Sequence, residues 1–129
     1  MGTIAKNKRE VKLYYNSNNS LGQQAFAYVQ ATNKDVLAID ISKTKVTGTQ
    51  WTELAKNLDL AVADLVDKKH PNFKEAYGSE PVNLKETDWI KVLQSEPTCL
   101  KGPVLINGSR HYLIKTPSEV SKYLPSETH

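Results

Sequence analysis

The sequence contains a single cysteine, Cys99, and no apolar run that approaches the roughly 20 residues needed to cross a bilayer. One thiol excludes an internal disulfide, a Cys-x-x-Cys redox pair and a zinc site built on cysteines. The charged residues near the start of the chain are not followed by the apolar stretch of a secretory signal. We therefore expect a cytoplasmic protein without a membrane-spanning segment.

The chain also lacks a strong excess of either charge. Its 17 basic and 14 acidic residues give a net charge of +3, and the two kinds are interspersed. Proteins that bind nucleic acid usually gather basic residues in a patch or stripe, so we do not expect nucleic acid as a partner. The length, 129 residues, suits one core. We predict a single domain over residues 11–124, a disordered segment over residues 1–10 and a short tail over residues 125–129.

Two further kinds of site lack the residues that they need. The three histidines, His70, His111 and His129, stand far apart without a carboxylate motif beside them, which is poor spacing for a metal site. Nothing resembles a glycine-rich phosphate loop or the elbow that presents a nucleophilic serine. We therefore predict no metal ligands and interpret the histidines as solvated surface residues.

The first third of the chain has the pattern of a strand, a helix and a second strand. Residues 11–15 alternate into a β-branched and aromatic run, and residues 16–20 are a cluster of Asn and Ser typical of turns and helix caps. Apolar residues at helical spacing predict a helix that closes near residue 33, and residues 35–41 have the pattern of a second strand. A single helix between two strands favours a right-handed parallel β-α-β unit.

The middle of the chain is predicted to be helical. Thr47 begins a stretch with the spacing of a capping box, and Asp59 is placed to cap a second, shorter helix. A residue before proline is pushed out of the helical region, so we expect that helix to end at His70 and residues 70–83 to form a loop or broken turns. Asn83 is predicted to cap the next helix. The apolar residues predicted to face the core from these helices are Trp51, Leu54, Ala55, Leu58, Val62, Leu65, Val66, Trp89, Ile90, Val92 and Leu93.

The last third is organised around a proline followed by a predicted hairpin. Proline has no N–H to donate, so Pro103 fits the first position of a strand rather than its middle. Residues 104–106 form a short apolar run, and Asn107-Gly108 can supply the two positive-φ residues of a type I′ turn. Residues 110–114 then return antiparallel, and a short helix completes the chain.

This order of elements predicts the fold class. A parallel β-α-β unit, then helices, then a β-hairpin and a terminal helix give an α/β protein with a mixed four-stranded sheet and helices on both of its faces. It is the order of the thioredoxin-like fold with a helical insertion between the two halves.

Within this order, three segments resemble the arsenate reductase family that is related to glutaredoxins. Residues 13–16 are similar to the family's first strand and the turn after it, residues 96–104 to its proline, apolar pair and arginine–cis-proline, and residues 116–120 to its last helix. The resemblance extends over nearly all of residues 11–124. It implies a thioredoxin-like fold, a cis peptide bond before Pro103 and, for an intact member, arsenate reduction that depends on glutathione and glutaredoxin.

The same alignment indicates that the reactive residues of the family are missing. Asn19 stands where the family has its nucleophilic cysteine, Gly102 and Thr116 replace two arginines, and Asp67 lies near the position of a third. A cysteine at a helix N-terminus is activated because the helix dipole and free amides stabilise the thiolate, and asparagine offers no ionisable group. Arginine binds oxyanions through charge-assisted forked hydrogen bonds, which glycine and threonine cannot make. We therefore predict no catalytic residue and no arsenate reductase activity.

The resemblance leaves a candidate binding cleft between the turn before the first helix and the proline edge. In this fold the backbone beside the cis-proline pairs with a peptide or with glutathione, a role that needs no particular side chain. The residues predicted to line the cleft are Ser17, Asn19, Ser20, Gly102 and Pro103. For Asn19 and Ser20 the competing interpretation is ordinary helix capping. Cys99 is predicted to be buried and inert, because it falls at an apolar position of the family just ahead of a strand.

These observations favour a binding or interaction module without oxidoreductase activity, whose protein partner the sequence does not identify. Two alternatives stay open. One is a glutathione-dependent transferase or reductase, in which Ser17 and Ser20 would stabilise the thiolate of the ligand. The other is a regulatory protein that docks on a larger assembly, as a redox-sensing branch of this family docks on RNA polymerase, although the sensing cysteine pair of that branch is absent here. No cofactor is predicted, apart from glutathione as a ligand of this cleft.

Overall fold

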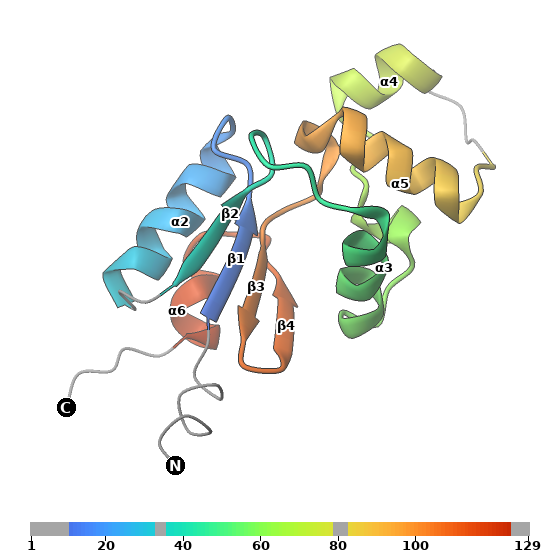
Figure 1. Cartoon of the computed structure of the whole chain (residues 1–129). Coiled ribbons are helices and arrows are strands. Elements are labelled where there is room, and N and C mark those ends of the chain that lie inside the picture. The colour runs from blue at the N-terminus through green and yellow to red at the C-terminus, as the bar shows by residue number, and fades with distance from the viewer. Residues whose placement is uncertain (1–10, 33–35, 79–82, 125–129) are drawn as a thin grey trace.

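The computed structural model describes residues 11–32, 36–78 and 83–124. Four strands form one sheet in the order β2-β1-β3-β4, with the helices arranged around it (Figure 1). The strands are β1 (Val11–Tyr15), β2 (Leu37–Asp40), β3 (Val104–Asn107) and β4 (Arg110–Leu113). β1 runs parallel to β2 and antiparallel to β3, which pairs antiparallel with β4. The predicted mixed four-stranded sheet, with one parallel unit and one hairpin, is confirmed.

Helices cover both faces of this sheet, as predicted. α2 (Ser20–Thr32) and α6 (Glu119–Tyr123) share one core cluster with one face of the sheet. The other face packs against the inserted segment, which contains α3 (Gly48–Asn57), α4 (Pro71–Tyr77), α5 (Glu86–Ser95) and two 3-10 helices, η1 (Val62–Leu65) and η2 (Pro97–Cys99). The inserted helices lie on the opposite side of the sheet from α2 and α6 (Figure 1). None of the described helices is long and apolar enough to span a membrane.

Alternation along the two central strands divides the core in two. Leu13 and its register partner Leu105 belong to the cluster beneath α2 and α6, whereas Tyr14 and its partner Val104 belong to the cluster of the inserted helices. All four residues are buried. Side chains of a strand alternate with a period of two, so a slip of one residue would exchange the two faces. The same register places the end of β1 beside the start of β3, which brings the turn before α2 close to Pro103.

Hydrogen bonds to free backbone N–H groups determine where the inserted helices begin. The capping box predicted at Thr47 is present, because Thr47 Oγ1 accepts from the Gln50 N–H at 3.1 Å and Gln50 Oε1 accepts from the Thr47 N–H at 3.0 Å. The cap predicted at Asn83 is wrong. α5 begins after Lys85, whose N–H donates to the Asp88 carboxylate at 3.2 Å. A carboxylate at the third helical position can serve a preceding residue that has no acceptor of its own.

The roles predicted for Asp59 and His70 are also wrong. Asp59 caps no helix; it has a φ of 64° in the connection after α3. The residue before η1 is instead Ala61, whose N–H donates to Asp64 Oδ2 at 3.1 Å. His70 begins a helix rather than ending one, since its Nδ1 accepts a backbone N–H at 3.0 Å and caps α4. Pro71 fits the first position of α4 because the N–H missing there would have no partner in the helix. The stretch predicted as a loop or broken turns therefore contains a helix.

The turn between β3 and β4 is of a different type from the one predicted. Asn107 pairs with Arg110, so the two turn residues are Gly108 and Ser109. Gly108 has a φ of 67°, and Ser109 has no positive φ, which is the arrangement of a type II′ rather than a type I′ turn. Asn107 is not a turn residue because it is held in the sheet, where its side chain also donates to the Tyr123 carbonyl at 3.2 Å.

The peptide bond before Pro103 is trans, since none of the described peptide bonds is cis. The cis bond implied by the family resemblance is therefore wrong for this chain. Trans is the favoured form of an X–Pro bond by about 0.5–1 kcal/mol. Gly102 fits this backbone because a Cβ at its position would overlap the Ile114 carbonyl oxygen. A residue with a Cβ, such as the arginine that the resemblance places here, would not fit at residue 102 in this conformation.

Some boundaries lie outside the described residues. These are the predicted disordered segment 1–10, the tail 125–129 and the end of the first helix near residue 33, all of which stay predictions. β2 extends over Leu37–Asp40, within the predicted range 35–41. The Ile41 N–H still donates to the Tyr15 carbonyl at 2.8 Å, and residue 35 lies outside the described residues.

Candidate functional site

The turn between β1 and α2, where the sequence placed a candidate ligand site, is held by its own side chains. Asn19 Oδ1 accepts from the Gly22 N–H at 2.7 Å and so caps α2. Asn16 Oδ1 accepts from the Asn18 N–H at 2.8 Å. Asn16 is only 3% exposed, and its Nδ2 has no partner. The capping interpretation of Asn19 is confirmed, and the carboxamide faces the backbone of its own helix.

A carboxylate that sequence reasoning missed organises the other side of this turn. Asp40 is the last residue of β2, and its Oδ1 accepts from the Ser17 N–H at 3.2 Å, from the Ser42 N–H at 3.1 Å and from the Ser42 hydroxyl at 2.7 Å. Partial burial acts to raise the pKa of Asp40, but hydrogen bonds from Ser17 and Ser42 outweigh it and lower the pKa from 3.8 to about 2. The sequence did contain a signal for this carboxylate: Asp40 lies at the end of a predicted parallel strand, and ligands of α/β sheets bind at the carboxyl ends of such strands.

Ser17 and Ser20, the serines predicted to stabilise a ligand thiolate, already have partners. Ser17 Oγ lies 3.4 Å from Ser42 Oγ, and Ser20 Oγ accepts from Gln24 Nε2 at 2.7 Å. The hydroxyl of Ser20 can still donate one hydrogen bond outward. A thiolate next to Ser17 would face the Asp40 carboxylate, and two like charges at short distance destabilise each other. The geometry therefore gives little support to a serine-stabilised thiolate on the Ser17 side.

Gly102 and Pro103 lie next to the start of α2, and the Leu21 side chain reaches toward Gly102. Both residues are buried. Leu21 Cδ2 lies 3.5 Å from the position that a Cβ of Gly102 would take. The Pro103 carbonyl accepts from the Ile114 N–H at 2.8 Å, which uses the backbone acceptor that a ligand strand would need. The structure thus brings the five predicted residues into one region, whereas ligand binding by them stays a prediction.

Cys99 is buried, as predicted, and packs in the cluster of the inserted helices. Its exposed fraction is 0%. Burial raises the pKa of its thiol, and the carboxylates of Glu96 and Asp67 raise it further. Because the thiolate is the reactive form, a raised pKa and the lack of solvent contact both make Cys99 a poor nucleophile.

The positions aligned with the oxyanion-binding arginines carry no positive charge. The Thr116 N–H donates to Glu119 Oε1 at 3.3 Å, and the Asp67 N–H donates to the Cys99 carbonyl at 2.6 Å. The sequence contains two arginines. Arg9 lies outside the described residues, and Arg110 begins β4, at the end of the sheet opposite to the start of α2. Within the described part of the chain, no arginine lies near the turn before α2.

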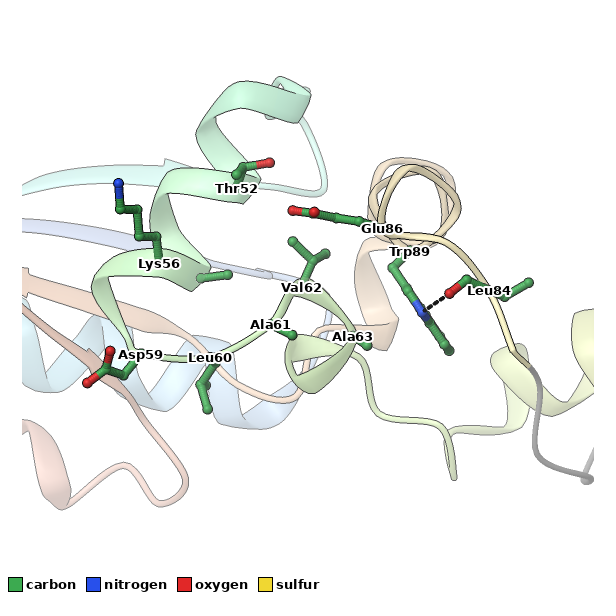
Figure 2. A pocket seen from close by; sticks show the side chains of 11 residues that line it. Thr52, Lys56, Asp59, Leu60, Ala61, Val62, Ala63, Leu84, Glu86 and Trp89 are labelled. Carbon is green, nitrogen blue, oxygen red and sulfur yellow. Dashed lines mark hydrogen bonds between the residues drawn. The ribbon is translucent and has the colours of Figure 1, made fainter.

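A hollow of 560 Å³ lies between α3, the connection after it and the start of α5. Figure 2 shows Lys56 and Asp59 at one end of it and Glu86 and Trp89 at the other. The indole N–H of Trp89 donates to the Leu84 carbonyl at 3.2 Å and is thus engaged. None of the predicted site residues lines this hollow, and sequence reasoning missed it because its walls come from separate segments.

A second hollow, of 610 Å³, runs beside β4 and is lined by residues of the inserted segment, β4 and α6. Its charged lining residues are two lysines and two carboxylates, Lys101, Lys115, Asp64 and Glu119, so their formal charges cancel, and His111 also contributes to its surface. We call this hollow the β4 groove. Sequence reasoning missed it for the same reason, since its residues are drawn from three parts of the chain.

Metal-ligating side chains are dispersed in this fold. Among residues 11–32, 36–78 and 83–124, no three His, Cys, Asp or Glu residues are grouped so that they could hold a metal ion. The ring of His70 caps α4, and Nδ1 of His111 lies 3.1 Å from the Ser109 carbonyl oxygen. Both histidines are partly exposed, while His129 lies outside the described residues.

Comparison with known proteins identifies the fold. No family model and no curated protein matches the chain. Among solved structures, it is similar to the arsenate reductase from Vibrio cholerae, with 17% identity and a TM-score of 0.72 over 88% of this chain and 97% of that one. It is also similar to an arsenate reductase-related protein from Brucella melitensis, with 16% identity and a TM-score of 0.63 over 90% of this chain and 95% of that one. The chain therefore has the thioredoxin-like α/β fold of arsenate reductases and of proteins related to them.

Proposed function

We propose that this protein, whose fold is shared with arsenate reductases, is a binding module and performs no thiol chemistry. The observation that supports this most directly is the 2.7 Å hydrogen bond from the Gly22 N–H to Asn19 Oδ1. It uses the helix N-terminus for capping, at the position where the resemblance places a nucleophilic cysteine. The only cysteine of the chain is fully buried elsewhere.

The chemistry of arsenate reduction needs two things that the described residues do not provide. A nucleophilic thiol must be ionised and accessible, and Cys99 is neither favoured as a thiolate nor exposed. In the family, arginines hold the oxyanion through charge-assisted forked hydrogen bonds, whereas no arginine of the described residues lies near the turn before α2. The described residues thus lack the clamp that the resemblance assigns to arsenate binding.

The ligand that we propose for this face is an extended peptide or glutathione. The N–H groups of Ser20 and Leu21, at the start of α2, have no hydrogen-bond partner among the described residues. Free N–H groups at a helix N-terminus bind carboxylates, and both ligands carry one. Since the Pro103 carbonyl is bonded to Ile114, binding would rely on the start of the helix rather than on strand pairing at residues 102 and 103.

The test is an NMR titration of the full chain with glutathione, with a short peptide that has a free carboxyl terminus, and with arsenate. We expect glutathione or the peptide, but not arsenate, to shift the amide signals of residues 16–22. Ser20→Pro removes one free N–H at a helix position that tolerates proline, and it should weaken binding. Ser20→Ala is the matched control, because it keeps the N–H and removes only the hydroxyl.

The outcomes separate the proposal from its alternatives. A loss of binding in Ser20→Ala would favour the glutathione-dependent enzyme, because only that reaction needs the hydroxyl. The absence of shifts with millimolar glutathione and with the peptide would exclude this face as a ligand site. Arsenite production in a turnover assay with glutathione and glutaredoxin would overturn the proposal of a module without thiol chemistry.

A further inference from the structure

A third hollow, of 250 Å³, lies on the face of the sheet that carries the inserted helices. Two register pairs of β1 and β2 form its floor, Lys12 with Leu37 and Tyr14 with Ile39. Tyr14 and Ile39 belong to the cluster of the inserted helices, and side chains two residues apart on a strand share a face. The floor is thus a polar row along β1 beside an apolar row along β2. We call this hollow the β2 hollow.

The connection between β2 and α3 forms the wall of the β2 hollow (Figure 1). Thr44, Lys45 and Val46 of this connection line it, and the first turn of α3 adds Gln50. The capping box orients Gln50, because its Oε1 accepts from the Thr47 N–H at 3.0 Å. Nε2 of the same carboxamide has no acceptor among the described residues. The wall therefore offers the hollow a positioned amide donor.

Every polar side chain that lines the β2 hollow can donate a hydrogen bond, and none of them is a carboxylate. Lys12 and Lys45 give the lining two positive charges. Neither ammonium group has an ion-pair partner in the part of the chain that the structure describes. The hydroxyl groups of Tyr14 and Thr44 have no hydrogen-bond partner in the same ranges. The lining is thus a set of unused donors around a positive charge.

Tyr14 is the donor that is built most deeply into the fold. Its side chain is only 8% exposed. Among the described residues, the fully buried side-chain atoms without a partner are Asn16 Nδ2 and Trp51 Nε1, so the unpaired Tyr14 oxygen keeps contact with solvent. A buried tyrosine hydroxyl usually has a hydrogen-bond partner. Tyr14 therefore presents a donor that a bound molecule can satisfy.

One carboxylate acts on the β2 hollow from outside its lining. Burial raises the pKa of Tyr14, and the Glu53 carboxylate of α3 raises it further. Glu53 is exposed and does not line the hollow. Counting Glu53 against Lys12 and Lys45 still leaves one positive charge in excess. The raised pKa keeps Tyr14 protonated at neutral pH, so its hydroxyl remains a donor.

We propose that the β2 hollow binds the phosphate group of a small phosphorylated molecule. A phosphate monoester carries about −1.5 to −2 charge at pH 7 and three strong acceptor oxygens, which matches two ammonium groups and three neutral donors. Lysine binds phosphate as a point charge. The 250 Å³ volume is below the roughly 300–1,000 Å³ of pockets for drug-sized ligands, so the ligand is small. Leu37, which is 51% exposed, would contact its organic part. The site is separate from the start of α2 and requires no ligand there.

The first experiment is an NMR titration of the full chain with phenyl phosphate at constant ionic strength. We expect the amide signals of residues 12–14, 37–39 and 44–50 to shift and those of residues 17–22 to stay unchanged. Inorganic phosphate should shift the same residues with lower affinity, because it has no apolar part to contact Leu37. Inorganic phosphate that binds at least as tightly would show that the free ion is the ligand and overturn the assignment to an ester. Phenol that binds as tightly as phenyl phosphate, or shifts confined to residues 17–22, would overturn the phosphate site itself.

Matched variants test the positive charge. Lys12→Gln with Lys45→Gln should weaken the binding of phenyl phosphate at least about tenfold, since hydrogen bonds from charged donors are lost. Lys74→Gln with Lys91→Gln removes the same charge from α4 and α5, outside the lining, and should change the affinity by less than about twofold because solvent and salt screen distant charges. Equal affinity in the two double variants, each with native tryptophan fluorescence, would contradict the proposal.

Two single variants test the other groups around the β2 hollow. Tyr14→Phe keeps the buried ring, removes the hydroxyl and should weaken binding about three- to tenfold. Glu53→Gln removes the carboxylate nearest to Tyr14 in its effect and should tighten binding, whereas Glu75→Gln on α4 should leave it unchanged. Weaker binding in Glu53→Gln would show that the hollow does not select an anion. If Tyr14→Phe fails to fold, the lysine and glutamate variants decide.

Discussion

Replacing Asp40 by asparagine should destabilise the fold near neutral pH and remove part of its acid sensitivity. The hydrogen bonds from Ser17 and Ser42 hold the pKa of Asp40 at about 2, against an ordinary value of 3.8. At about 1.4 kcal/mol per pKa unit, this difference corresponds to an upper limit of about 2.5 kcal/mol. Solvent screens a carboxylate that is only partly buried, so we expect Asp40→Asn to lower the free energy of unfolding by about 1–2 kcal/mol.

The sign of the pH dependence follows from the direction of this shift. A carboxyl group whose pKa is lower in the folded chain stabilises the fold above its unfolded pKa. For Asp40 the contribution is complete at pH 7, decreases as the pH falls below about 5, and is lost once the pH passes the folded pKa of about 2. Urea unfolding between pH 7 and pH 2.5, followed by the fluorescence of Trp51 and Trp89, measures this directly. The two tryptophans are buried and therefore report unfolding.

The control is Glu75→Gln, which removes an exposed carboxylate of α4 and should leave the pH dependence unchanged. The wild-type chain should lose stability more steeply than Asp40→Asn between pH 5 and pH 2.5. An equal slope in both proteins, or an Asp40 carboxyl that titrates near pH 4 by NMR, would refute the reasoning. Either result would mean that the serine hydrogen bonds do not favour the charged form in solution.

Three further changes test other parts of the structure. Asn19→Ala removes the cap of α2 and should cost about 1 kcal/mol in urea unfolding, while Asn19→Ser, which keeps a capping oxygen, should cost much less; equal losses would contradict the capping role. Cys99 should react with a disulfide reagent at least about a hundredfold more slowly in the native chain than in urea, and equal rates would show that the thiol is accessible. Gly102→Ala should lower the free energy of unfolding by about 2 kcal/mol or more, because its Cβ would overlap the Ile114 carbonyl. Gly48→Ala, where a Cβ would meet Ile90 at an ordinary 3.5 Å, is the control and should be nearly neutral.

The sheet and its layers could be predicted from the sequence because buried residues recur with the period of their helix or strand. Trp51 and Leu54 of α3 and Val92 of α5 belong to apolar positions at helical spacing and are all buried, and the apolar run after Pro103 forms β3. The starts of the helices could not be predicted as well. Asp59 and Asn83 are good capping residues by type. The helices nevertheless begin after Ala61 and Lys85, two residues later in each case, because a carboxylate three residues further on accepts the free N–H there.

Only the part of the candidate site that is formed by residues close in sequence could be predicted. Asn19 and its role as a cap could be inferred from the turn cluster, since the hydrogen bond spans three residues. The network of Ser17, Asp40 and Ser42 depends on the register of β1 with β2, which composition and spacing do not encode. The cis bond before Pro103 that the resemblance implied is wrong. The family has an arginine before its cis-proline, whereas this chain has Gly102, whose backbone lies where a Cβ would overlap the Ile114 carbonyl oxygen.

The ligand proposed for the start of α2 would be held mainly by backbone donors. Ser20 and Leu21 offer N–H groups there. Backbone groups persist when side chains change, so the proposed binding would require neither the thiol nor the arginines that the resemblance assigns to the family. Side chains would then determine where the ligand lies. The Asp40 carboxylate accepts from the Ser17 N–H, so we expect a ligand carboxylate at Ser20 and Leu21 rather than at Ser17.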